Sequence, residues 1–110
     1  MLRLATCVVM VSLAGAAAAA AQDAGAKGEA VFAAQKCGLC HSVAGKGNSK
    51  GPLDEAVANL SVGEVRAWIT DAKGMTAKTK ATRKPAMKEF TLPKEDVDAL
   101  VAYLSSIKKK

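Results

Sequence analysis

The sequence is poor in the side chains that build most catalytic and metal sites. Its 110 residues include one histidine, His41, three cysteines and few aromatic residues. His41 is therefore the only imidazole that could bind a metal, and no second one remains for acid–base catalysis of the peroxidase kind. Histidine and cysteine ligands for a metal or cofactor in this chain can therefore come only from His41 and the three cysteines.

The apolar run at the N-terminus is too short to span a membrane. Leu4–Leu13 provides about ten apolar residues before the alanines, whereas a spanning helix needs roughly 20. Arg3 precedes this run, and an A-x-A-type cleavage site at Ala19–Ala21 follows it, which is the layout of a secretory signal peptide. We expect residues 1–21 to be cleaved, residues 22–110 to form one domain in the periplasm, and the mature chain to have no transmembrane segment.

Strand patterns are also missing, because no run alternates convincingly between apolar and polar residues. Apolar side chains recur instead at helical spacing, and Ser61 to Glu64 read as a capping box. The fold class is therefore predicted to be all-α. The predicted helices cover residues 23–36, about 62–72 and those after Leu92-Pro93. Residues 41–60 are predicted to be mostly loop, and residues 73–90 to be a lysine-rich loop.

Cys37, Cys40 and His41 form a C-x-x-C-H sequence, a signal for attachment of c-type haem. Two thiols at this spacing can bond the two vinyl groups of one porphyrin, and the next imidazole can reach the iron. Two other readings are weaker. A redox dithiol expects a βαβ pattern, and a structural zinc site takes four ligands. The mature chain offers only Cys37, Cys40 and His41 as nitrogen or sulfur ligands of zinc, because Cys7 is expected to leave with the signal peptide.

Several stretches resemble class I c-type cytochromes, in order and at familiar distances, over residues 25–107. They are "KGEAVFAAQKCGLCH", "GKGNSKGPL", "RAWITDAKGM" and "KPAMKEFTLPKEDVDALVAYL". The resemblance implies a cytochrome c fold, with three main helices and loops wrapped around one covalently attached haem c. It also implies a monomeric one-electron carrier rather than an enzyme.

The resemblance further implies how the haem is held. The family's sixth iron ligand comes from a loop before the last helix, which matches Met87 better than Met75. The carbonyl of the Gly-Pro proline, here Pro52, accepts a hydrogen bond from the ligand histidine, and Trp68 packs on or near the haem. Lys88 stands where family members commonly have proline, so the Met87 loop is expected to be less rigid.

Two pairs of residues on the first and last helices match the place where these helices cross in such cytochromes. They are Gly28 with Phe32, and Leu100 with Tyr103. We interpret all of them as residues that build the fold.

Basic residues gather in residues 73–88, around the predicted sixth ligand. They are Lys73, Lys78, Lys80, Arg83, Lys84 and Lys88, and we call them the basic loop. A charge run of this kind is often only a solvated face, but it would also steer redox partners that have an acidic docking surface. Nucleic acid is a poor candidate, because the loop has no interleaved aromatic residues.

Two other functions stay open at this point. The chain could be the haem subunit of a periplasmic dehydrogenase, or a haem sensor or weak peroxidase with a labile sixth ligand. The first would show as co-purification with a larger protein, and the second as rapid binding of carbon monoxide.

Overall fold

The computed structural model describes the backbone of residues 15–107 and the side chains from residue 25 to residue 107. Most of the predicted signal peptide and the terminal lysines 108–110 lie outside these residues. Along the chain the elements are α1 (Gly15–Ala34), η1 (Cys37–Leu39), β1 (Ser42–Val43), β2 (Lys46–Gly47), α2 (Leu53–Ala56), η2 (Val57–Asn59), α3 (Val62–Thr70), α4 (Ala72–Thr79) and α5 (Lys94–Ser106).

The described chain is predominantly helical, in agreement with the predicted fold class. Its only strands, within the described residues, are β1 and β2, which pair as a two-residue antiparallel hairpin. The turn between them uses left-handed backbone at Ala44 and Gly45, with φ of 51° and 80°. A hairpin this short has no alternating pattern, so the sequence did not reveal it.

The prediction of a loop from residue 73 was wrong at its start, where α4 forms. Asp71 caps this helix, and its carboxylate accepts a hydrogen bond from the backbone N–H of Gly74 at 3.1 Å. The predicted capping box of α3 is confirmed. The Ser61 hydroxyl accepts from the Glu64 N–H, and the Glu64 carboxylate accepts from the Ser61 N–H, both at 3.1 Å.

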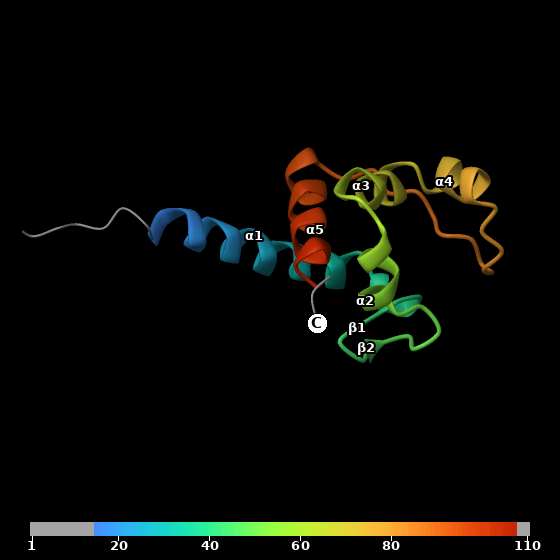
Figure 1. The fold of residues 1–110 in the computed structure, drawn as a ribbon, viewed down its shortest axis with the longest axis horizontal. Helices are drawn as coiled ribbons and strands as arrows, with labels where there is room; N and C mark the ends of the chain where they lie inside the picture. The colour runs from blue at the N-terminus through green and yellow to red at the C-terminus, as the bar shows by residue number, and fades with distance from the viewer. Residues whose placement is uncertain (1–14, 108–110) are drawn as a thin grey trace, which may run out of the picture.

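Helices α1 and α5 cross closely at Gly28, which is buried (Figure 1). A side chain at Gly28 would overlap the carbonyl oxygen of Ala99 and the Cβ of Tyr103. One turn further along α1, the rings of Phe32 and Tyr103 meet edge to face with centroids 5.9 Å apart. Glycine is therefore needed for the two backbones to approach.

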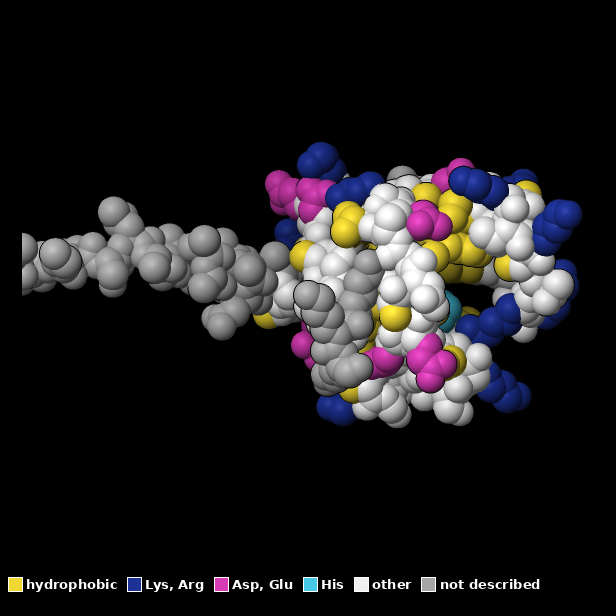
Figure 2. All heavy atoms as spheres, viewed as in Figure 1, with side chains coloured by type: hydrophobic (Ala, Val, Ile, Leu, Met, Phe, Trp, Pro, Cys, Tyr) yellow, Lys and Arg dark blue, Asp and Glu magenta, His cyan; other side chains and the backbone are white. Residues whose placement is uncertain are grey.

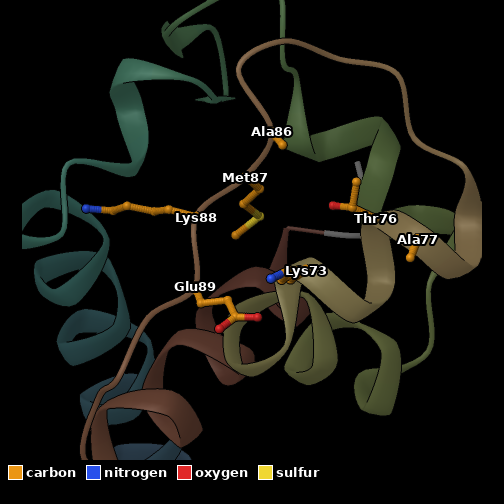
Figure 3. A pocket seen from close by; sticks show the side chains of 7 residues that line it. All are labelled: Lys73, Thr76, Ala77, Ala86, Met87, Lys88 and Glu89. Carbon is orange, nitrogen blue, oxygen red and sulfur yellow. The ribbon is translucent and has the colours of Figure 1, made fainter.

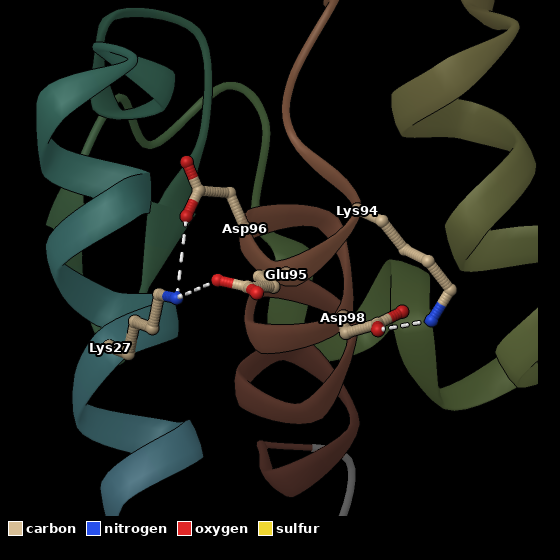
Figure 4. Close-up of polar contacts among 5 residues, drawn as sticks. All are labelled: Lys27, Lys94, Glu95, Asp96 and Asp98. Carbon is tan, nitrogen blue, oxygen red and sulfur yellow. Dashed lines mark hydrogen bonds and ion pairs between the residues drawn. The ribbon is translucent and has the colours of Figure 1, made fainter.

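Charged side chains frame the outer surface of α5. Lys27 of α1 lies 3.7 Å from the carboxylate of Glu95 and 3.6 Å from that of Asp96 (Figure 4). Asp98 pairs with Lys94 on its own helix and with Arg66 of α3, at 2.9 and 2.8 Å, and these partners lower its pKa, Lys94 most. Exposed pairs add little stability, so the core determines the packing of α1 and α3 on α5.

The core lies between α3 and α5, with a few side chains from the segments around β1 and η2. Its buried members are Val43, Val57, Val65, Ile69, Val97, Leu100, Val101, Leu104 and Ile107. Within the described residues no helix is both long enough and apolar enough to cross a membrane.

Gly28→Ala should destabilise the protein although alanine is the better helix former. The helix gains about 1 kcal/mol in propensity, but overlap with α5 should cost about 1–3 kcal/mol and separate the helices. Gly25→Ala is the matched control, because a side chain there meets nothing within 4 Å. Denaturant unfolding of the haem-loaded protein should show a loss for Gly28→Ala and none for Gly25→Ala. Equal stabilisation by both would contradict the close crossing.

Candidate functional site

Cys37, Cys40 and His41 lie on one tight turn that follows α1. The backbone N–H groups of Cys40 and His41 both bond to the carbonyl of Cys37, at 3.2 and 2.9 Å. Both thiols are unpaired, with Cys37 half-buried and Cys40 exposed. Burial raises the pKa of the Cys37 thiol, and the nearby positive charge of Lys88 opposes this effect. Two reduced thiols and an imidazole are thus held on five consecutive residues.

One ring nitrogen of the half-buried His41 already has a partner. Its Nδ1 lies 3.3 Å from the carbonyl oxygen of Gly51, so an N–H there can donate to it. Desolvation lowers the pKa of His41, and the charge of Arg83 adds to this. A neutral ring with Nδ1 engaged leaves Nε2 free, which is the state that a metal ligand requires.

This carbonyl is one residue earlier than expected, since Pro52 was predicted to provide it. Gly51 also accepts the backbone N–H of Ser42 at 3.0 Å, which turns its carbonyl toward the 41–42 segment. Pro52 forms a β-bridge with Ser42 and stands at the N-cap of α2. The hydrogen bond to His41 is therefore reassigned to Gly51, whereas proximity of Pro52 to the haem stays a prediction.

Asn48, in the loop that follows His41, is hydrogen-bonded to the backbone of the cysteine–histidine turn. Its backbone N–H is shared between the carbonyls of Gly38 and His41, both at 3.1 Å. Its side-chain Nδ2 donates to the carbonyl of Leu39 at 3.0 Å. Next to it, Gly47 lies so close that a side chain there would overlap the His41 carbonyl. The loop after His41 thus holds the backbone of the whole motif.

Met87 and Met75 have different surroundings. Met87 is half-buried and lines a hollow of about 450 Å³ between its own loop and α4. Figure 3 shows its side chain pointing into this space, whereas the side chain of Lys88 points the other way. Met75 is 7% exposed within the packed part of α4. Of the two, Met87 has a sulfur with open space beside it.

The Met87 loop faces the cysteine–histidine turn although it is about 45 residues away along the chain. The guanidinium of Arg83 donates a hydrogen bond from Nη2 to the carbonyl of Cys40. The charge of Lys88 acts on Cys37, and its Nζ lies 5.0 Å from the ring centre of Phe90. In Figure 2 an opening separates this part of the chain from the body of the molecule.

These residues fit a c-type haem. The two thiols are free, the imidazole presents its second nitrogen, and a thioether comes from a loop across an opening that the protein's own side chains leave unfilled. Trp68 is half-buried on α3. Its contact with haem stays a prediction.

Three contributors to the site were not predicted from the sequence. They are Gly51, Asn48 and Arg83. Asn48 and Gly51 lie in the glycine-rich loop that the sequence had marked as following the motif. Arg83 was grouped only with the basic residues of 73–88, and no sequence pattern near it indicates a contact with Cys40.

Comparison with known proteins supports the same assignment. The Cytochrome c family matches residues 25–108. The chain is also similar to cytochrome c oxidase subunit 2 of Alkalihalophilus pseudofirmus, with 33% identity over 94 residues. That match covers 74% of this chain but 25% of the subunit, so the chain spans about a quarter of that relative's length. No solved structure matches.

Gly47→Ala should disturb the motif much more than Gly45→Ala. Both glycines have positive φ, 110° and 80°, so alanine should cost about 1–2 kcal/mol of backbone strain at either position. At Gly47 the overlap with the His41 carbonyl should add about 1–3 kcal/mol, whereas a side chain at Gly45 meets nothing within 4 Å. Unfolding free energies and the fraction of chains carrying haem would measure this. Similar values for the two variants would remove the assigned role of Gly47.

Proposed function

The chain belongs to the cytochrome c family, and we propose that it is a one-electron carrier whose haem iron is bound by His41 and Met87. Members of this family bind haem c covalently, so the cofactor here is haem c. It supplies an iron that cycles between Fe(II) and Fe(III) without transforming a substrate. The observation that carries the proposal is the position of the Met87 loop, which is tied by Arg83 to the segment that contains Cys40 and His41.

In this proposal Cys37 and Cys40 would form the thioether bonds, and His41 would bind the iron through Nε2. The Gly51 carbonyl keeps the ring oriented and increases its basicity. The half-buried Met87 provides the other ligand. Methionine opposite histidine raises the reduction potential of haem iron, as suits an electron carrier.

We further propose that residues 1–21 export the protein and that the haem domain works in the periplasm. Covalent attachment gives a small exported domain the extra stabilisation that a limited core cannot supply. The support for export is the charged, apolar and alanine-rich order of the first 21 residues.

A second candidate follows from the similarity to an oxidase subunit. The chain could act as the haem-carrying component of a larger redox assembly, because its relative is a subunit of cytochrome c oxidase. A free carrier should be recovered from its native source as a monomer. Stable co-purification with an oxidase or dehydrogenase would favour the assembly.

Met87→Ala should remove the sixth ligand. We expect loss of the methionine–iron absorption band, a high-spin or lysine-bound iron, and a lower midpoint potential. Met75→Ala is the control, and it should keep the band while losing about 2–5 kcal/mol of stability, because it opens a cavity in a packed region. Visible spectra with a spectroelectrochemical titration would measure both. The opposite pattern would move the ligand to Met75, and a wild type that binds carbon monoxide rapidly would favour the sensor or peroxidase reading.

The basic loop should steer negatively charged redox partners to the haem. Lys84 and Lys88 are both exposed, and Figure 2 shows Lys and Arg side chains along the edge of the molecule that faces away from α1. A double change to glutamate should slow oxidation of the reduced protein by anionic ferricyanide roughly tenfold at low ionic strength. It should accelerate oxidation by a cationic cobalt(III) phenanthroline complex.

The control for this prediction is the double change of Lys46 and Lys50 to glutamate. Both residues are exposed, on β2 and the loop after it, and the net charge changes equally. Its effect on both oxidants should be smaller, and all rates should converge at high salt because the Debye length falls to about 3 Å at 1 M. An intact methionine–iron band is required in each variant, since Lys88 adjoins Met87. Equal effects of the two double changes would mean that the net charge alone acts.

A further inference from the structure

Arg83 connects the two halves of the site through backbone groups. Its Nη2 donates to the carbonyl of Cys40, which is 43 residues away in the sequence. Its Nη1 lies against Gly51, where a side chain would overlap both this nitrogen and the Cys40 carbonyl. Gly51 is also the residue whose carbonyl faces His41. The guanidinium of Arg83 therefore contacts both Cys40, which precedes His41, and Gly51, whose carbonyl orients the His41 ring.

Arg83 is exposed, so water and salt screen its charge in part. Within the described residues, however, Arg83 forms no ion pair with a carboxylate, and its partners are neutral backbone groups. A fixed positive charge near a haem iron disfavours the additional positive charge of Fe(III) and thus favours Fe(II). Lys88, whose charge acts on Cys37, packs over the ring of Phe90.

We propose that Arg83 is a positioning residue of the haem site, which holds the Met87 loop against the Cys40–His41 backbone and raises the reduction potential through its charge. The inference rests on the proposed function, because it takes Met87 as the ligand on that loop. Arg83 precedes Met87 by only four residues, so a tether at Arg83 limits how far the thioether can swing away. Gly51 is necessary for this, because a larger residue would displace the guanidinium.

Two variants of Arg83 distinguish its role as a tether from the effect of its charge. Arg83→Lys keeps the charge but cannot reproduce the planar fork that contacts Cys40 and Gly51 together. Arg83→Gln keeps a hydrogen-bond donor but removes the charge. Lys78→Gln is the matched control, because it removes one charge from an exposed residue in the last turn of α4, outside the contact with Cys40.

Spectroelectrochemical titration of the haem-loaded proteins tests the charge. At the wild-type midpoint potential, Arg83→Gln should raise the ratio of Fe(III) to Fe(II) roughly threefold to tenfold, whereas Arg83→Lys and Lys78→Gln should change it much less. Hydrogen exchange of residues 80–90 tests the tether, and exchange should quicken in both Arg83 variants but not in Lys78→Gln.

Each outcome decides a separate claim. The potential can be measured whichever side chain is the sixth ligand, and the methionine–iron band of the wild type reports on the proposed function independently. An unchanged potential in Arg83→Gln, or a shift matched by Lys78→Gln, would overturn the role of the charge. Unchanged exchange of residues 80–90 in both Arg83 variants would overturn the tether.

Discussion

The close crossing of α1 and α5 at Gly28 is the contact on which the haem site depends. The C-terminal end of α1 leads directly into the turn of Cys37, Cys40 and His41, and the loop with Met87 leads directly into α5. When the two helices pack, the turn with His41 and the loop with Met87, which the proposed function assigns to the haem, are brought to the same part of the molecule. Gly28 makes this approach possible because a side chain there would overlap α5.

The buried core is small and lies mainly on α3 and α5, and Val31 and Phe32 of α1 pack against it. It leaves Met87 and Trp68 only half-buried, and an opening remains beside the Met87 loop (Figure 2). A large flat apolar cofactor would bury such side chains, which a domain of this size needs for stability. Folding and cofactor binding are therefore expected to be coupled, with the covalent bonds keeping the cofactor in place.

Polar backbone groups, rather than charged pairs, fix the geometry around His41. The carbonyl of Gly51 orients the ring, Asn48 holds the carbonyls around it, and Arg83 closes the arrangement from the distant loop. The positive charges of the basic loop have a different proposed role, which is to attract negatively charged redox partners. Ionic screening should affect encounter with partners strongly and the internal arrangement weakly, because the hydrogen bonds to backbone carbonyls act at short range.

The sequence by itself determined the features that depend on a few neighbouring residues. The spacing of Cys37, Cys40 and His41 indicated haem attachment, the box from Ser61 to Glu64 marked the start of α3, and apolar spacing predicted α5. Met87 was chosen by resemblance, and the structure adds that its sulfur has open space beside it and that Arg83 ties its loop to the Cys40 backbone.

Only the tertiary structure decided which backbone groups meet. The acceptor of the His41 hydrogen bond is Gly51 rather than Pro52, because that choice depends on the direction of one carbonyl in a loop. The contact of Arg83 with Cys40 joins residues far apart in the sequence, and no local pattern records it. Covalent spacing and helix caps act over a few residues and can be read directly, whereas these contacts depend on how two loops fold back on the cysteine–histidine turn.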